Sequence, residues 1–232
     1  MIFLGIDDTD MPETPGTNQL ARKIATAIRE QYRCLRIVRH QLCGDPSIPC
    51  TSKNGSASLW LEPLSSHDST TLLNRVRRLM LDNFIPGSDP GLCLALEVPL
   101  SIQQFGLRAK EAIVTQSQAR TLAHDAGMTL IGLGGTEGGV IGALAAVGLA
   151  ATGNDGRIVQ IHGWEDDLYG KVDVTAIRER GIVVRSLSDQ RPINHGIVDL
   201  VKKLRPNCSA GEIVLNVIPG ESDSHWIAVK AP

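Results

Sequence analysis

Hydrophobic and polar positions alternate along the chain with two different periods. Short apolar or alternating runs, which are typical of strands, occupy residues 2–6, 35–42, 56–61, 91–98, 157–162 and 182–185. Segments with an apolar residue every three or four positions, which are typical of helices, occupy residues 18–32, 68–83, 117–127, 140–151, 175–180 and 193–204. Two further runs, 213–218 and 226–229, predict a closing hairpin. The pattern therefore predicts a mixed α/β or α+β protein.

The first predicted helix carries a single apolar stripe. Leu20, Ile24 and Ile28 recur at helical spacing, and Thr17 stands where an N-cap residue belongs. We therefore expect one face of this helix to pack on the predicted sheet.

Composition excludes some functional classes. The 232 residues carry 23 Lys and Arg against 25 Asp and Glu, a net charge of −2, which excludes a strongly basic nucleic-acid footprint over the whole chain. Aromatic residues make up only 3%, too few for an aromatic stacking platform as well as a core. No apolar stretch reaches the roughly 20 residues of a membrane span. We expect a cytoplasmic protein, because the N-terminus turns acidic at once and the five cysteines form no CxxC pair.

The clearest candidate site follows the first predicted strand. Asp7, Asp8 and Asp10 place three carboxylates within four residues. In an extended chain Asp8 and Asp10 would share one face and Asp7 the other, unless the chain turns. Crowded carboxylates repel each other unless a cation or hydrogen-bond donors neutralise them, and such oxygen ligands suit Mg²⁺ together with substrate phosphates. The alternative is a turn of solvated aspartates, but the position at a strand end favours metal or nucleotide binding.

Gly16 and Thr17 open the next helix. The free N–H groups at a helix start and the helix dipole favour an anion such as a phosphate. The acidic strand end, the loop and this helix start could together hold a metal-bridged phosphate. The equal alternative is that Thr17 only caps its own helix.

Two further segments are candidates for ligand contacts. Residues 48–57 form a loop rich in hydroxyl and amide groups, with one cation, Lys53. Such a loop can donate hydrogen bonds to phosphates or base edges. The alternative is a plain turn, as most loops of this composition are. Residues 132–139 are a glycine cluster spaced GxGxxxG with no following Lys, so neither a Rossmann fingerprint nor a Walker loop is present. Close packing explains the small residues of the helix at 140–151, but the glycines ahead of it exceed what packing needs.

Three segments in this order resemble the catalytic part of the archaeal tRNA(Ile2) 2-agmatinylcytidine synthetases. They are residues 5–10 (GIDDTD), the loop at 49–57 and the glycine-rich stretch at 138–148. That family joins agmatine to the wobble cytidine of an isoleucine tRNA with ATP, through a phosphorylated cytidine. The run after Gly16 is shorter here than in the family, and residues 53–56 read KNGS where the family has RGNG.

By position, the resemblance implies roles for the candidate residues. Asp7, Asp8 and Asp10 would hold Mg²⁺ and the ATP phosphates, and Thr17 would match the threonine that accepts phosphate. The expected nucleotide contacts are Gly16, Lys53, Asn54, Gly134, Gly135, Gly138 and Gly139.

The resemblance also implies a fold of two intertwined α/β lobes. We expect a kinase-like, nucleotide-binding catalytic lobe from residues 1–62 and 108–170. A ferredoxin-like lobe is expected from residues 63–107 and 171–232.

The expected function is ATP- and Mg²⁺-dependent phosphoryl or nucleotidyl transfer by a ligase- or kinase-like enzyme. The family's OB-fold and zinc ribbon, which grip tRNA, have no counterpart in these 232 residues. We therefore expect a nucleoside, agmatine, another amine or another small molecule as acceptor, or tRNA with the help of a partner. The alternative is a non-catalytic nucleotide or metabolite sensor, and an RNA-binding module is a third hypothesis.

Overall fold

The computed structural model describes residues 1–51, 53–66, 68–164, 167–222 and 224–229. The chain divides into two compact units. Unit 1 comprises Met1–Thr152 and Val159–His162, and unit 2 comprises Gly153–Ile158 and Gly163–Pro232. Strands and helices occur in both units, which confirms the mixed α/β class.

Unit 1 begins with a split β-α-β-β-α-β arrangement. Its elements are β1 (Ile2–Asp7), α1 (Thr17–Ile28), β2 (Tyr32–Gln41), β3 (Gly55–Pro63), α2 (Ser69–Asp82) and β4 (Gly91–Ala95). β1 pairs antiparallel with both β3 and β4, and β2 pairs antiparallel with β3. The resulting order β4-β1-β3-β2 is the ferredoxin-like topology.

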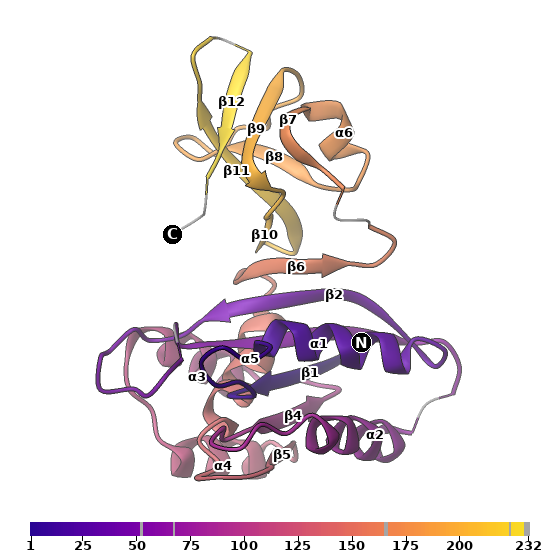
Figure 1. The fold of residues 1–232 in the computed structure, drawn as a ribbon, viewed down its shortest axis with the longest axis vertical. Coiled ribbons are helices and arrows are strands. Elements are labelled where there is room, and N and C mark those ends of the chain that lie inside the picture. Colours follow the sequence, from indigo (N-terminus) through magenta and orange to yellow (C-terminus); the bar gives the residue numbers. More distant parts are fainter. Residues whose placement is uncertain (52, 67, 165–166, 223, 230–232) are drawn as a thin grey trace. The chain divides into compact units, whose positions relative to one another are not determined.

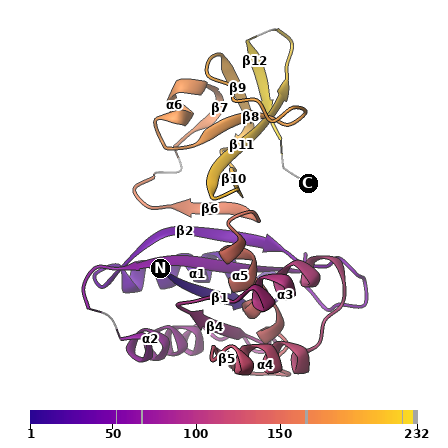
Figure 2. The same ribbon diagram turned by 180° about the vertical axis from the view of Figure 1, so that it is seen from behind.

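The rest of unit 1 extends this sheet and covers its second face. The further elements are α3 (Leu100–Glu111), α4 (Gln116–Asp125), β5 (Thr129–Gly132), α5 (Val140–Thr152) and β6 (Arg157–Ile161), whose last residues belong to unit 1. β5 pairs with β4, and β6 lies beside β2. Figures 1 and 2 show the sheet between α1 and α2 on one side and α3, α4 and α5 on the other. Each face has its own hydrophobic cluster, so both sides of the sheet are buried.

Helix α5 lies so close to the sheet that its backbone touches β1. A Cβ atom at Gly5 would collide with the carbonyl group of Ala143, and one at Gly142 would collide with the carboxylate of Asp7. On the other side of α5, a Cβ at Gly148 would collide with the carbonyl of Ile102 in α3. Close packing therefore accounts for the small residues within this helix, as expected from its composition.

The observed division of the chain differs from the expected one. Residues 63–107 lie in unit 1, because α2 shares the core of α1 and β4 pairs with β1 in the register Leu4↔Leu94. The ferredoxin-like order therefore belongs to residues 2–95, and not to 63–107 with 171–232. Strand pairing over such distances leaves no local signal in the sequence.

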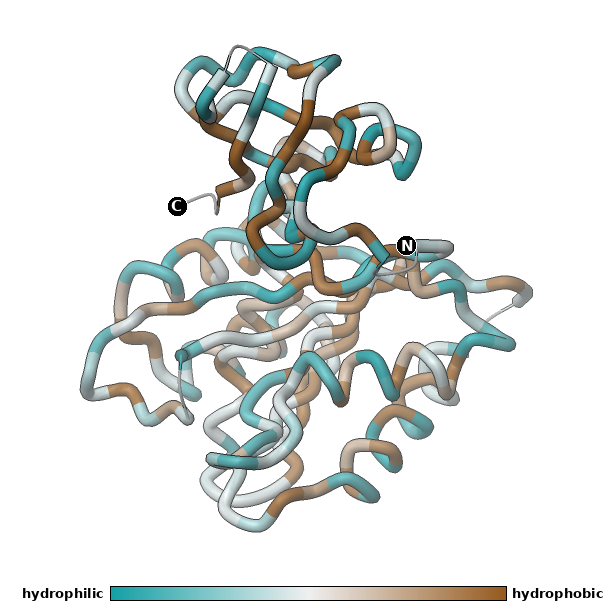
Figure 3. The backbone as a smooth tube through the Cα atoms, turned by 45° about the horizontal axis from the view of Figure 1, so that its top comes forward, coloured by the Kyte–Doolittle hydropathy of each residue, from teal (hydrophilic) through white to brown (hydrophobic). Residues whose placement is uncertain are grey.

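Unit 2 is mostly β-structure. Its elements are β7 (Tyr169–Asp173), α6 (Val174–Arg178), β8 (Val183–Ser186), β9 (Ile197–Lys203), β10 (Asn207–Ser209), β11 (Glu212–Pro219) and β12 (His225–Ala228). β11 and β12 form the expected hairpin. β9 lies between β12 and β7, and β8 runs parallel to β11. Figure 3 shows hydrophobic residues along the strands of each unit and hydrophilic residues in many of the connecting loops.

The helix predicted at residues 193–204 is wrong, because β9 occupies most of that range. Ile193, Ile197, Leu200 and Leu204 are spaced by four, three and four residues, which imitates a helix. The buried positions within the strand, Val198 and Leu200, follow the period of two that a strand requires.

The length of the apolar helices and the state of the cysteines are two further features of the structure. No helix in the described ranges is long and apolar enough to cross a bilayer. All five cysteines are free, and only Cys50 is exposed.

A capping box stabilises α4. The Thr115 hydroxyl accepts the Gln118 N–H (3.2 Å), and the Gln118 side chain accepts the Thr115 N–H (3.0 Å). We expect Thr115→Ala to lower the free energy of unfolding by about 1 kcal/mol, measured by urea denaturation. The control is Ser117→Ala, an exposed position in the same turn. Equal effects of the two substitutions would contradict the cap.

Candidate functional site

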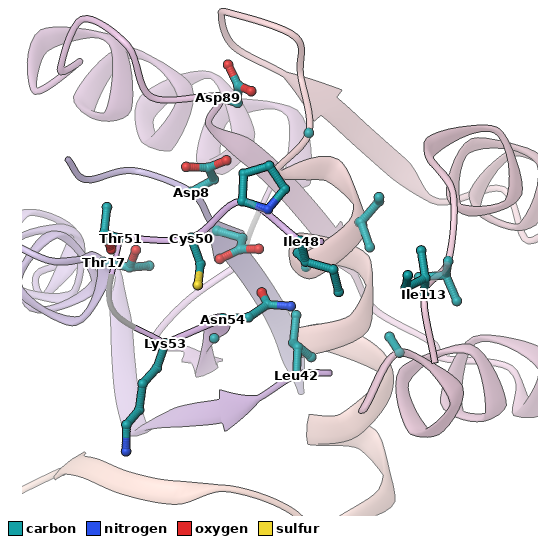
Figure 4. A pocket seen from close by; sticks show the side chains of 18 of the residues that line it. Asp8, Thr17, Leu42, Ile48, Cys50, Thr51, Lys53, Asn54, Asp89 and Ile113 are labelled. Atoms are coloured by element: carbon teal, nitrogen blue, oxygen red, sulfur yellow. The ribbon is translucent and has the colours of Figure 1, made fainter. Parts of the chain in front are cut away.

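A cavity of about 240 Å³ opens at the C-terminal end of β1 in unit 1. Four carboxylates, three hydroxyls, one amide and one ammonium group contribute to its lining, and a wall of apolar side chains completes it. The polar lining residues are Asp7, Asp8, Asp10, Asp89, Thr17, Thr51, Thr136, Asn54 and Lys53. Figure 4 shows Asp8 and Asp89 on one side, with Leu42 and Ile113 of the apolar wall on the other.

A turn of the backbone brings the three expected carboxylates to one cavity. Asp8 has φ 52°, in the left-handed region that aspartate tolerates better than most residues. This conformation ends β1, so Asp7, Asp8 and Asp10 all line the cavity, whereas an extended chain would place Asp7 on the opposite face.

Asp7 is the most perturbed of these acids. Burial raises the pKa of Asp7 to about 7; the hydrogen bond from the Asp8 backbone opposes this shift, and the charges of Asp8 and Asp10 add to it. The Arg39 guanidinium lowers the pKa slightly. A carboxylate in this position gains from a nearby cation more than a solvated one would.

The raised pKa of Asp7 makes stability depend on pH. The folded state holds the Asp7 proton to about pH 7, whereas the unfolded chain loses it near the ordinary value of 3.8, so the stability from the neutral carboxyl is present at low pH and is lost as the pH rises through 7. We expect Asp7→Asn to stabilise the metal-free protein at pH 8 by up to roughly 4 kcal/mol, and to have little effect at pH 4.

Denaturant titrations at both pH values in EDTA test this expectation. The control is the exposed carboxylate of Asp82, replaced by asparagine. A difference between Asp7→Asn and wild type that is the same at pH 4 and pH 8 would contradict the raised pKa.

Asp8 shares its side of the cavity with Asp89. Burial raises the pKa of the Asp8 carboxyl, and the negative charges of Asp89 and Asp10 raise it further. A hydrogen bond from the Asp89 backbone N–H acts in the opposite direction. Asp8 therefore lies partly buried next to like charges.

Both carboxylate oxygens of Asp10 accept hydrogen bonds from threonine hydroxyls. Thr17 Oγ1 donates to Asp10 Oδ1 (2.9 Å), and Thr51 Oγ1 donates to Asp10 Oδ2 (3.3 Å). The buried hydroxyl of Thr9 donates to Thr17 Oγ1 (3.1 Å) and thereby directs the Thr17 proton toward Asp10.

Thr17 does not cap α1, so that interpretation is wrong. Gly16 is the N-cap residue and makes no side-chain cap bond, and Thr17 is the first helical residue. The Thr17 hydroxyl faces the preceding loop because Asp10 and Thr9 bind it there.

The expected contacts of the middle loop lie at the cavity in part. Lys53 lines it, but its side chain extends away from Asp8 and Asp89 (Figure 4). The side-chain amide of Asn54 donates to the backbone carbonyl of Cys43 (2.9 Å), and the backbone carbonyl of Asn54 accepts the N–H of Leu42 (3.0 Å). Asn54 therefore connects the two ends of the loop. Ser52 lies outside the described residues.

The glycine cluster contributes less to the lining than expected. Gly138 lines the cavity, but Gly16, Gly134, Gly135 and Gly139 are not among its lining residues. The latter three serve chain packing: Gly134 abuts the Phe84 ring, Gly135 abuts Asp89, and Gly139 approaches the backbone of Gly91.

The sequence pattern does not indicate Asp89 or Thr136 as residues of the site. Asp89 stands in a Ser-Asp-Pro-Gly run before β4, a composition that indicates only a turn. The register Asp7↔Gly91 brings it beside the end of β1. Thr136 donates its backbone N–H to Asp89 Oδ1 (2.9 Å).

The carboxylates fit a Mg²⁺ ion in a different way from the one expected. Within the part of the chain that the structure describes, no group of three or more His, Cys, Asp or Glu side chains is placed to hold a metal. Asp10 is occupied by two threonine hydroxyls, which leaves Asp7 and Asp8. One or two carboxylates with substrate phosphates and water are the usual ligands of Mg²⁺, so this smaller set fits the ion.

Comparison with known proteins gives one sequence relative and a set of structural neighbours. No family model matches the chain. It is 26% identical over 155 residues to the tRNA(Ile2) 2-agmatinylcytidine synthetase TiaS of Pyrococcus horikoshii, a match that covers 64% of this chain and 35% of the relative. The chain thus spans about a third of the length of this curated relative.

Solved structures agree with this match. A tRNA fluorescent labeling enzyme superposes with a TM-score of 0.56 at 24% identity, over 63% of this chain and 35% of that one. TiaS in complex with tRNA(Ile2) and ATP gives 0.55 at 24% identity, over 63% and 36%. At these identities the structural likeness shows a shared fold. The chain is therefore TiaS-like over somewhat less than two thirds of its length.

Proposed function

We propose that unit 1 binds ATP with Mg²⁺ in the cavity at the end of β1 and transfers a phosphoryl or nucleotidyl group from it. The observation that carries the proposal is the convergence of Asp7, Asp8 and Asp10 on one cavity, with the Thr17 hydroxyl bound to Asp10. The similarity to TiaS, which has been solved in complex with ATP, supports a nucleotide as the ligand.

Different residues of the cavity have different roles in the proposed chemistry. Asp7 and Asp8 would hold the Mg²⁺ ion, which when bound neutralises charge on the phosphates. Asp10 accepts the hydrogen bond of Thr17 and is placed to take its proton if Thr17 attacks a phosphate. The apolar wall, including Leu42 and Ile113, offers an apolar surface to a base.

The acceptor belongs to the same proposal. TiaS has been solved with tRNA(Ile2), an ATP analogue and agmatine. The cavity here has four carboxylates, and its one lysine extends away from Asp8 and Asp89. This charge balance supports a cationic acceptor such as agmatine or another amine over an anionic one.

Binding and turnover of ATP are tested separately. Calorimetry with ATP, with and without Mg²⁺, should show Mg²⁺-dependent binding, and thermal unfolding should show stabilisation of about 2.7 kcal/mol at 100 times the Kd. Thin-layer analysis of labelled ATP then separates an enzyme from a sensor, since a sensor binds without product. Absence of Mg²⁺-dependent binding would contradict the proposal.

Identification of the acceptor needs a second assay. The chain is incubated with ATP and Mg²⁺ in the presence of agmatine, of total tRNA or of both, and nucleosides and amines are analysed by mass spectrometry. We expect ATP consumption to rise with an amine present. Consumption that responds to no amine and to no tRNA would contradict this choice of acceptor class.

A further inference from the structure

Asp89 lies in the loop before β4, with its carboxylate and carbonyl bound to the glycine-rich turn and its backbone N–H close to Asp8. Its carboxylate accepts hydrogen bonds from the backbone N–H of Thr136 (2.9 Å) and from the Thr136 hydroxyl. Its carbonyl accepts the N–H of Gly139 (2.9 Å), and its own N–H lies close enough to the Asp8 carboxylate to lower the pKa of that group. One residue thus joins the acidic strand end to the glycine-rich turn.

The turn that Asp89 holds does not have a relaxed backbone. Gly135 (φ 58°) and Glu137 (φ 62°) both lie in the left-handed region, which is costly for glutamate. Such a conformation persists only where surrounding contacts determine it. The two hydrogen bonds from Thr136 to Asp89 supply such contacts directly ahead of α5.

The arrangement carries an electrostatic cost in the absence of a ligand. The carboxylate of Asp89 is close enough to Asp8 for their negative charges to repel each other. A cation bound at Asp8 turns this repulsion into attraction, because the same charges then surround a positive ion.

We infer that Asp89 is a positioning residue for the proposed Mg²⁺-dependent chemistry. It orients the Asp8 carboxylate through its backbone and holds residues 135–139 against the end of β1 through its side chain. The inference rests on the proposed function, since Asp89 acts on the cation through Asp8 and not by direct contact. Removing such an outer partner of a metal ligand typically costs about 10- to 100-fold in metal affinity or activity.

Three variants test the inference with Mn²⁺ as the probe. Asp89→Ala removes both side-chain acceptors, whereas Asp89→Asn keeps an oxygen for the Thr136 N–H and an amide that can donate to the hydroxyl. Asp82→Asn changes an exposed carboxylate on α2 and is the control. Binding of Mn²⁺ is followed by electron paramagnetic resonance, amide hydrogen exchange at Thr136 and Gly139 by NMR, and ATP turnover by product analysis.

We expect Asp89→Ala to weaken Mn²⁺ binding by about 10- to 100-fold and to lower kcat to a similar extent, with a smaller change in KM for ATP. Amide exchange at Thr136 should accelerate. Asp89→Asn should restore both binding and exchange protection to within about threefold of wild type. A purely structural role would lower thermal stability and leave Mn²⁺ affinity unchanged, and a charge-based role would leave Asp89→Asn as impaired as Asp89→Ala. Either result would overturn the inference.

Two outcomes separate this inference from the proposed function. If the wild-type chain binds neither Mn²⁺ nor ATP, the proposed function fails and Asp89 has no ion to serve. If the wild type binds both and Asp89→Ala behaves like Asp82→Asn, the inference alone fails. Should Asp89→Ala not fold, Thr136→Val removes only the hydroxyl donor and should weaken Mn²⁺ binding about threefold or more; unchanged affinity in that variant would overturn the inference.

Discussion

Replacing Asp8 with asparagine should lower ATP turnover by about two to three orders of magnitude, the usual cost of removing one group that stabilises developing charge. Asp8 lines the cavity together with Asp89, whose negative charge raises the pKa of the Asp8 carboxyl. Asparagine tolerates the left-handed backbone of this position (φ 52°) about as well as aspartate, so the substitution removes the charge without straining the turn.

The measurement is initial-rate product formation from labelled ATP over a range of Mg²⁺ concentrations. Because burial and like charges raise the pKa of Asp8, removal of its charge should not destabilise the metal-free fold, and thermal unfolding verifies this. Asp82→Asn is the matched control, an aspartate-to-asparagine change on the surface of the same unit. Turnover by Asp8→Asn equal to that of the control would remove Asp8 from the proposed chemistry.

The largest expected loss of stability comes from Gly5→Ala. Gly5 lies in the middle of β1, and a Cβ atom there would collide with the backbone carbonyl of Ala143 in α5. A backbone group cannot rotate away as a side chain can, so α5 must shift from the sheet. We expect the free energy of unfolding to fall by about 3 kcal/mol, at the upper end of the usual range for overpacking.

Urea denaturation compares this variant with Gly44→Ala. No atom lies within 4 Å of a Cβ built at Gly44, and its backbone does not need a positive φ, so the control should change stability by less than about 1 kcal/mol. If the two variants unfold at the same urea concentration, the close approach of α5 to β1 is wrong. The result also bears on the site, because Asp7 leaves β1 directly against Gly142 of the same helix.

The hydrophobic pattern predicted most elements of unit 1, and the reasons are local. An alternating run such as Ser56–Leu61 forms a half or fully buried strand whichever strand it pairs with. Helix α2 begins directly after its N-cap residue, Asp68. The pattern does not predict helix α3, and it predicts a helix over β9 because the spacing of the apolar residues there is ambiguous between the two periods. In both cases packing partners distant in sequence decide the structure.

Part of the candidate site could be predicted, because some of its residues are neighbours in the sequence. Asp7, Asp8, Asp10 and Thr17 follow each other closely in the chain, so their types and spacing alone indicated a shared site, and the structure places all four at one cavity. The partner of Thr17 could not be predicted, since a threonine at a helix start ordinarily caps that helix. Hydrogen bonds from Thr9 and to Asp10 determine where its hydroxyl lies.

The amino-acid sequence by itself determined the class of the fold, the acidic strand end and the small-residue helix, because period, charge and residue size are properties of neighbouring positions. Tertiary structure alone decided the rest. The pairing of β4 with β1 brings Asp89 to Asp8 from 81 positions farther along the chain, and the turn ahead of α5 brings Thr136 to Asp89. Such contacts arise from strand register and backbone packing, which depend on the whole core and leave no mark on the residues next to them in the sequence.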